Sequence, residues 1–151
     1  MPRHSEQRKF PYPAELVFDV VCDVRSYPEF LPWCSGTRIR KETDNLIIAD
    51  MVIRYNGLRE SFTSRVHLDR SNLRIDVSYE DGPFKYLINN WRFIDFGDNC
   101  SVNFFIDFEF RSLIYGKLMG LFFNHSVQHM INAFETRVIS IASARGVSST
   151  S

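Results

Sequence analysis

The sequence lacks the features that mark secreted, disulfide-bonded and membrane-spanning proteins. It has three cysteines, widely spaced and without a CxxC pair, so neither a disulfide framework nor a zinc knuckle is expected. Met1 to Phe10 contains no apolar signal core. The longest apolar run, Leu113 to Phe123, is about eleven residues long and includes Lys117, whereas a membrane span needs about 20 residues. These absences predict a cytoplasmic protein with no transmembrane helix.

Net charge is also absent, because 18 basic residues balance 18 acidic ones. No overall field therefore draws the protein to nucleic acid, and DNA is not an expected partner. One local excess remains between Gly36 and Arg74, where eight basic residues face five acidic ones. This segment is either the solvated face of a sheet or a docking surface for RNA, a ribosome or a membrane. Four arginines decide between these interpretations, namely Arg38, Arg40, Arg59 and Arg65. If they form a single exposed ridge, docking is favoured, and if acidic residues are interspersed among them, the docking interpretation is weakened.

Catalytic motifs are missing as well. The chain contains neither a GxSxG nucleophile elbow nor a phosphate-binding GxGxxG, and no convincing acid/base pair is visible. His125 and His129 have the spacing of two zinc ligands on a helix, but no third ligand accompanies them. The sequence therefore predicts no catalytic residue, no metal site and no cofactor, and the protein is expected not to be an enzyme.

Aromatic residues, in contrast, are abundant, with 14 Phe, 6 Tyr and 2 Trp in 151 residues. Flat rings pack a solid core well, and they also line cavities that hold isoprenoid, sterol or quinone ligands. Burial in a solid core would account for them at about 1.5–3 kcal/mol per ring. Periodicity alone does not decide between a core and a cavity.

The order of the expected elements indicates an α+β fold in a single domain, residues 1–151. A strand at 5–10 precedes a helix at 14–24 and a short helical turn within 26–33, where prolines alternate with large apolar residues. Six strands separated by turn signals fill 36–111, which gives an antiparallel sheet of about seven strands. The period then changes to 3.6 residues, which predicts a C-terminal helix of about thirty residues laid across the sheet. Gly146 is expected to stop it, leaving a frayed tail at 145–151.

One acidic residue interrupts an apolar strand face. Glu60 lies between Leu58 and Phe62 on the face that alternation assigns to the interior. An ionised carboxylate is costly there unless it is paired or solvated. Glu60 therefore either sits at a wet strand end or hydrogen-bonds the polar headgroup of a ligand inside a cavity.

Four segments together resemble a known family, namely Tyr27 to Cys34, Asp81 to Leu87, Trp91 to Phe93 and Asp107 to Phe110. They are similar to the coenzyme-Q-binding START-like family of the polyketide cyclase superfamily, which includes bacterial proteins named ribosome-association toxin. The resemblance covers about residues 5–145. It implies a helix-grip fold, in which the curved sheet surrounds the long helix over a hydrophobic cavity. With strand alternation, it implies a cavity lined by Trp33, Phe62, Val77, Tyr79, Trp91, Phe93, Phe104, Ile106, Phe108, Phe122, Met130 and Phe134.

The same resemblance implies two alternative functions. The first is non-catalytic binding and transport of ubiquinone, or a related polyisoprenoid, in support of respiratory electron transport. This carrier would contact the membrane surface transiently, at the inner membrane, and Leu118 to Phe123 would form an entrance lip. The alternative is a ribosome-association inhibitor that binds the large ribosomal subunit, a role that needs a surface and no cavity.

Overall fold

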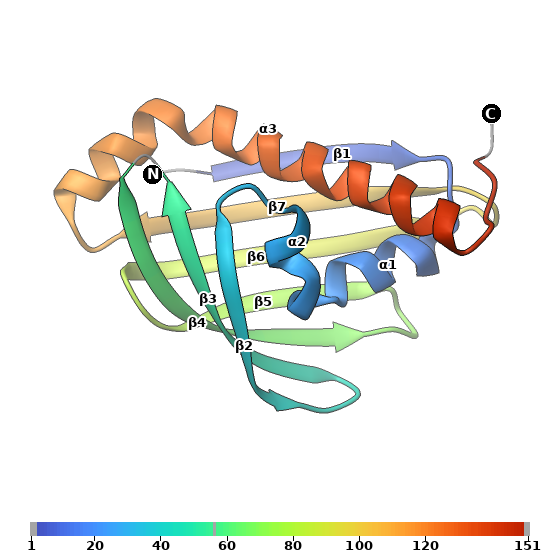
Figure 1. Cartoon of the computed structure of the whole chain (residues 1–151), viewed down its shortest axis with the longest axis horizontal. Helices are drawn as coiled ribbons and strands as arrows, with labels where there is room; N and C mark the ends of the chain where they lie inside the picture. The colour runs from blue at the N-terminus through green and yellow to red at the C-terminus, as the bar shows by residue number, and fades with distance from the viewer. Residues whose placement is uncertain (1–2, 56, 150–151) are drawn as a thin grey trace.

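The computed structural model in Figure 1 describes residues 3–55 and 57–149, without the side chains of residues 55, 58 and 118–125. Its seven strands are β1 (Arg3–Phe10), β2 (Cys34–Glu42), β3 (Leu46–Tyr55), β4 (Leu58–Asp69), β5 (Arg74–Asp81), β6 (Phe84–Asp95) and β7 (Cys100–Phe110). Its helical segments are α1 (Ala14–Cys22), the short 3-10 turn η1 (Val24–Ser26), α2 (Tyr27–Phe30) and α3 (Leu113–Ala144). This order of elements confirms the predicted α+β fold.

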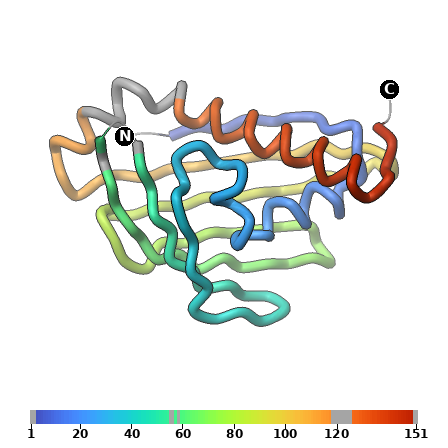
Figure 2. Tube along the Cα trace, viewed as in Figure 1, coloured from blue at the N-terminus to red at the C-terminus, as the bar shows by residue number. Residues whose placement is uncertain are grey.

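The strands form one antiparallel sheet in the order β1-β7-β6-β5-β4-β3-β2. Strands β2 to β7 each pair with their neighbours in the chain, and β1 pairs with β7, so the first and last strands lie together. Helix α3 runs alongside β1 and packs on α1 and β7 (Figure 2). The sheet thus curves around a long C-terminal helix, as the sequence predicts.

Period-two alternation decides which face of the sheet is buried. In β7 the side chains of Val102, Phe104 and Phe108 are buried, whereas Asn103 between them is exposed. In α1 the helical period buries a stripe instead, and Glu15 points outward. Both patterns turn their apolar side chains toward the space between the sheet and the helices.

Side chains around α1 are almost completely enclosed. Phe18 of α1 is completely buried and meets Phe93 of β6 edge-on, with ring centroids 5.4 Å apart. Val138 of α3 and Ile75 of β5 are each 1% exposed. Cys100 also lies buried, and burial raises the pKa of its thiol to about 11. A fully formed helix therefore fills this half of the interior.

The C-terminal end of α3 is more ordered than the sequence suggests. Gly146 has a φ of 70°, and its N–H donates to the Ser143 carbonyl, while the Val147 N–H donates to Ala142. This pair of bonds is a Schellman motif, which satisfies carbonyls left open at a helix end. Val147 also packs against the core. The predicted frayed tail at 145–151 is therefore wrong for residues 145–147, because they close the helix.

Candidate ligand pocket

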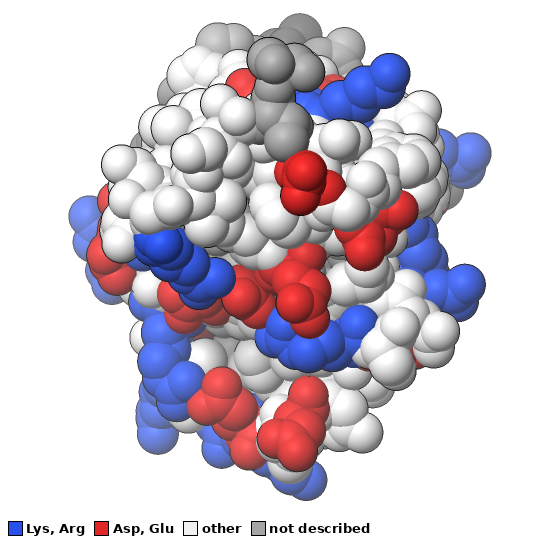
Figure 3. Space-filling model, turned by 90° about the vertical axis from the view of Figure 1, so that its right-hand side faces the viewer, with Lys and Arg blue, Asp and Glu red and all other residues white. Residues whose placement is uncertain are grey.

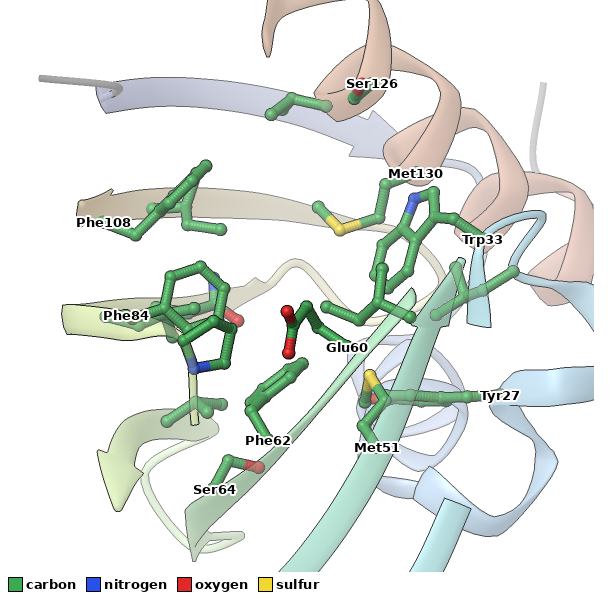
Figure 4. A pocket seen from close by; sticks show the side chains of 18 of the residues that line it. Tyr27, Trp33, Met51, Glu60, Phe62, Ser64, Phe84, Phe108, Ser126 and Met130 are labelled. Atoms are coloured by element: carbon green, nitrogen blue, oxygen red, sulfur yellow. The ribbon is translucent and has the colours of Figure 1, made fainter. Parts of the chain in front are cut away.

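An apolar pocket of about 190 Å³ lies between the sheet and α3. Its walls come from β3 to β7, from the segment around α2, and from α3 (Figure 4). Eight of the residues predicted from the sequence line it, namely Trp33, Phe62, Val77, Trp91, Ile106, Phe108, Met130 and Phe134. The side chain of Phe122 and the expected lip, Leu118 to Phe123, lie outside the described residues.

The structure places three predicted residues beside the pocket instead of in its wall. Phe93 packs under α1 against Phe18. Phe104 is buried with its ring edge-on to Trp91, 4.8 Å between centroids, at the β1 side of the sheet. Tyr79 lies against the ring of Phe84, and its hydroxyl accepts the Phe84 N–H at 3.2 Å. All three side chains lie on the inner face of the sheet, like the lining residues. They do not border the pocket, because the side chains packed against them fill the adjacent space.

Phe84, at the start of β6, is the principal lining residue that sequence reasoning missed. Its ring is edge-on to Phe62 and to Phe108, with centroids 5.5 Å away in each case. Gly82 makes this position possible, because a Cβ there would lie 2.6 Å from the Cβ of Phe62. Its φ of 142° is also one that residues with a side chain rarely adopt. The Asp81-Gly82-Pro83-Phe84 turn was thus a usable signal, because a glycine before an aromatic residue fits a close backbone approach.

The segment from Tyr27 to Cys34 covers the pocket from the side of α2. The Tyr27 hydroxyl donates to the Val21 carbonyl, and burial raises the pKa of this phenol. Tyr27, Phe30 and Phe134 form an edge-on trio with centroids 5.3–5.8 Å apart. The backbone of Trp33 accepts a hydrogen bond from the Arg54 N–H at 2.7 Å, which ties this segment to β3. The prolines that break regular structure here leave a short aromatic cover instead of a long helix.

The polar side chains in the pocket wall decide what chemistry it offers. Asn89 is already engaged, because its amide donates to the Phe105 carbonyl and its oxygen accepts the Trp91 indole N–H, each at 2.9 Å. Glu60 points its carboxylate into the space between the aromatic rings (Figure 4). Tyr115, in the first turn of α3, donates its hydroxyl to Glu60, and this bond raises the pKa of Tyr115. Glu60 is therefore a pocket residue near the start of β4, and a hydrogen bond from it to a ligand headgroup stays a prediction.

Ser64, two positions beyond Phe62 on the inner face of β4, is the other polar residue of interest. Ser64 is only 4% exposed, and it lines the pocket. No hydrogen bond to its hydroxyl is found among the described residues, and no buried side-chain nitrogen or oxygen of the described residues lacks a partner. The hydroxyl therefore faces the hollow of the pocket and not packed atoms.

The described lining offers little for catalysis. Glu60 is its one carboxylate, and no histidine or cysteine among the described residues joins it in the wall. Within the same described part of the chain, no group of three or more His, Cys, Asp or Glu side chains could hold a metal ion. The pair His125 and His129 is not fully described, because the side chain of His125 lies outside the described residues. The geometry suits the binding of an apolar molecule with one polar group.

Acidic residues are interspersed among the arginines of the basic segment. On the outer face of the sheet, Arg40 pairs with Asp50 at 2.8 Å and Arg65 pairs with Glu80 at 3.3 Å. The face seen in Figure 3 likewise carries blue and red groups side by side. Exposed ion pairs of this kind leave little net field. The interspersed acids weaken, by the criterion set from the sequence, a docking role for this set of arginines.

Among the described residues, no helix combines the length and the apolar character that crossing a membrane would require. The curved antiparallel sheet that grips a long helix over an apolar pocket defines the START-like, helix-grip class. A solved member, the Zhui aromatase/cyclase from Streptomyces sp. R1128, superposes with a TM-score of 0.84 over 97% of this chain and 98% of its own. At 18% identity, this likeness shows the fold alone.

Sequence comparison agrees with the fold. The family model described as polyketide cyclase/dehydrase and lipid transport matches residues 10–135. The chain belongs to this family. It is 41% identical to the ribosome association toxin RatA of Rickettsia prowazekii over 130 residues, 84% of this chain and 89% of that protein. It is 27% identical to the mitochondrial coenzyme Q-binding protein COQ10 homolog B of Xenopus laevis over 136 residues, 87% of this chain and 56% of that protein.

Proposed function

We propose that the protein binds an apolar ligand in the pocket and does not catalyse a reaction on it. The pocket itself carries this proposal. Nine aromatic side chains line a hollow with one carboxylate, namely Tyr27, Trp33, Phe62, Phe84, Trp91, Phe108, Phe110, Tyr115 and Phe134. A concave apolar wall with few polar groups is the usual form of a small-molecule site. The lipid-transport part of the family's description supports the binding of an apolar ligand.

The pocket volume limits which part of a ligand is enclosed. Small-molecule sites usually measure about 300–1,000 Å³, and this pocket has about 190 Å³. It therefore suits a ring-sized group with the beginning of a chain, and a longer tail would extend through the opening. Ubiquinone or another polyisoprenoid fits this description, because each buried CH₂ contributes about 0.8 kcal/mol. The relative named for coenzyme Q binding supports ubiquinone, although it is a more distant one.

Transient contact with a membrane surface belongs to this proposal. Leu113 and Ile114, the first residues of α3, are 85% and 71% exposed, beside pocket-lining Tyr115. Lys117 is exposed on the same turn. Adjacent exposed apolar residues with a cation nearby favour the interface of a bilayer with anionic headgroups. A lipid would then enter the pocket close to the surface that supplies it.

Extraction of the purified protein, followed by mass spectrometry of the released lipids, tests the proposal. Replacing Ile106 by Trp should fill the pocket and abolish the bound lipid, since Ile106 lines it from β7. Ile88→Trp is the matched control, because Ile88 is 45% exposed and lies on the other face of the sheet. The absence of any stoichiometric lipid in the wild-type protein would refute the proposal.

A second candidate concerns the cellular role and not the pocket. Relatives named ribosome association toxin are 33–41% identical to this chain over 82–96% of it. We propose that the protein takes part in ribosome association, by binding the large ribosomal subunit in the cytoplasm. These relatives support this role better than the COQ10 relative supports a role in respiration. A ribosomal surface and a lipid pocket do not exclude each other, because they use different parts of the molecule.

Arg54 and Arg59 are the basic residues best suited to such a surface. They lie directly opposite each other in β3 and β4, both exposed, and neither forms an ion pair with a described residue. Like charges at this spacing repel, and an RNA phosphate would relieve the repulsion. Arg54→Glu with Arg59→Glu should reduce co-sedimentation with large subunits, whereas Arg65→Glu is the control, because Arg65 is already paired with Glu80. If wild-type protein does not sediment with large subunits, the second candidate is wrong.

A further inference from the structure

The polar wall of the pocket holds one charged acceptor, Glu60, and two of its neighbouring donors are already engaged. The carboxylate of Glu60 only accepts hydrogen bonds, and it offers about four lone-pair sites. The Asn89 amide donates to the Phe105 carbonyl. The Trp91 indole donates to Asn89. The donors of Asn89 and Trp91 are therefore used within the wall itself.

The Glu60 carboxylate already accepts a hydrogen bond from an aryl hydroxyl, that of Tyr115. Its phenolic hydroxyl donates to Glu60 from the first turn of α3. The ring of Tyr115 is held edge-on to Phe110, with centroids 5.8 Å apart. One aryl hydroxyl thus already bonds to the carboxylate, and the carboxylate points into the hollow between Phe84, Phe108 and Met130 (Figure 4).

Ser64 supplies an independent observation. Its hydroxyl lines the same hollow in a residue that is 96% buried, and it has no hydrogen-bond partner among the described residues. A hydroxyl can turn to accept or to donate. The hydroxyl is reached from the hollow, because no buried side-chain polar atom of the described residues lacks a partner, so a ligand placed there would hydrogen-bond it. Ser64 and Glu60 therefore form, from one strand, a polar side in an otherwise aromatic pocket.

We propose that the pocket selects ligands whose ring or head carries a hydroxyl donor, such as a hydroquinone, a phenol or a prenol, over the matching carbonyl or ether compound. This inference rests on the proposed binding of an apolar ligand and specifies its chemistry. A hydroxyl placed against Glu60 gains a hydrogen bond to a charged acceptor. A quinone carbonyl in the same place brings two acceptors together and leaves the carboxylate desolvated without a new partner.

Two pairs of probes test the selection without any need to know the natural ligand. One pair is a decyl-substituted benzohydroquinone and its quinone, titrated anaerobically by calorimetry. The second pair is a long-chain 4-alkylphenol and its methyl ether, which differ by one donor and do not undergo the quinone redox reaction. We expect the wild-type protein to bind the hydroxyl member of each pair about tenfold more tightly or better.

Glu60→Gln should reduce this ratio to about twofold or less, because an amide both donates and accepts. Glu80→Gln is the matched control, since Glu80 is exposed on the next strand and pairs with Arg65 away from the pocket. Tyr115→Phe leaves the carboxylate in place and removes its internal donor, so the preference should persist or increase. Circular dichroism verifies that each variant is folded.

The outcomes separate this inference from the function on which it rests. Equal affinity for both members of a pair, or a preference that survives Glu60→Gln, overturns the selection for donors and leaves apolar ligand binding intact. If neither member of either pair binds to the wild-type protein, both the proposed ligand binding and the selection are wrong.

Discussion

The two ends of the interior use the same kinds of residue and reach different results. At the α1 end, Phe18 and Phe93 meet edge-on and Phe18 is completely buried. At the pocket end, Phe62 and Phe84 also meet edge-on, but Phe62 is 9% exposed and faces a hollow. Aromatic content alone therefore does not separate a core from a cavity.

The difference comes from what packs against the sheet. α1 is nine residues long and buries six of them, whereas α2 has four residues and buries none. A two-turn helix brings enough side-chain volume to fill the space over β6, and a single turn only covers it. The prolines at positions 28 and 32 limit the length of α2, because neither can supply an N–H to continue a helix. A few backbone-restricting residues thus keep the pocket open.

From this comparison, we expect the largest loss of stability for a substitution at the α1 end. Phe18→Ala should lower the free energy of unfolding by about 3–5 kcal/mol, because the ring is fully enclosed and the cavity left behind cannot collapse. Denaturant titration measures this loss. Ligand affinity, measured under conditions where the variant stays folded, should change little. A loss below about 1 kcal/mol would mean that the α1 end is not the solid half of the interior.

A smaller loss is expected for the same substitution at the pocket end. Phe108→Ala should cost about 1.5–3 kcal/mol, since the transfer of the ring is lost but the ring already borders empty space. Affinity for an apolar ligand should fall by at least about tenfold. The two phenylalanine variants then form a crossed pair, one affecting mainly stability and the other mainly binding. If both variants change stability and binding alike, the division of the interior is incorrect.

The sequence predicts which side chains of a strand face the interior, but it does not predict which of these side chains line the pocket. Trp91 and Phe93 are two residues apart on the inner face of β6, as alternation requires, yet Trp91 lines the pocket and Phe93 packs under α1. A period of two assigns both to the interior. Which of them meets a hollow depends on the helix packed from the other side, and that contact is distant in sequence.

Local backbone geometry explains two further differences. Phe84 follows Gly82 and Pro83. The backbone of Gly82 lies close to Phe62, and the ring of Phe84 lines the pocket beyond this turn. Alternation does not extend through such a turn, so the position of Phe84 is not predictable from the strand pattern. Val147 reaches the core because the left-handed Gly146 reverses the chain after α3. A polar, serine-rich composition favours a frayed tail and does not record this reversal.

Narrowing the hollow should stabilise the protein slightly and weaken its binding. Ser64→Val replaces a hydroxyl without a described partner by two methyl groups that point into the pocket. The expected gain is about 0.5–2 kcal/mol, at the expense of function, as cavity-filling substitutions often show. Ser61→Val is the matched control, because Ser61 is exposed on the same strand. A destabilised Ser64→Val variant would indicate that no hollow faces this position.

The smallest effect concerns the polar contacts between β1 and α3, which hold the helix over both ends of the interior. Glu6 accepts the Gln128 amide at 2.8 Å and pairs with Arg8 at 2.8 Å. Burial raises the pKa of Glu6, but hydrogen bonds from His4 and Gln128 and the charge of Arg8 outweigh it, so the pKa lies below its ordinary value of 4.5.

A carboxyl group whose pKa is lowered by folding stabilises the folded state above its ordinary pKa and loses this contribution as the pH falls through the folded value. Stability should therefore decline as the pH drops from about 5 toward 3, and Glu6→Gln should remove about 1 kcal/mol or less of that decline. Glu80→Gln, at an exposed pair, serves as the control. Because the helix spans both ends, the acid-induced loss should affect ligand affinity and core stability together. If acid lowers ligand affinity but leaves the free energy of unfolding unchanged, Glu6 acts at the pocket end alone and this prediction is wrong.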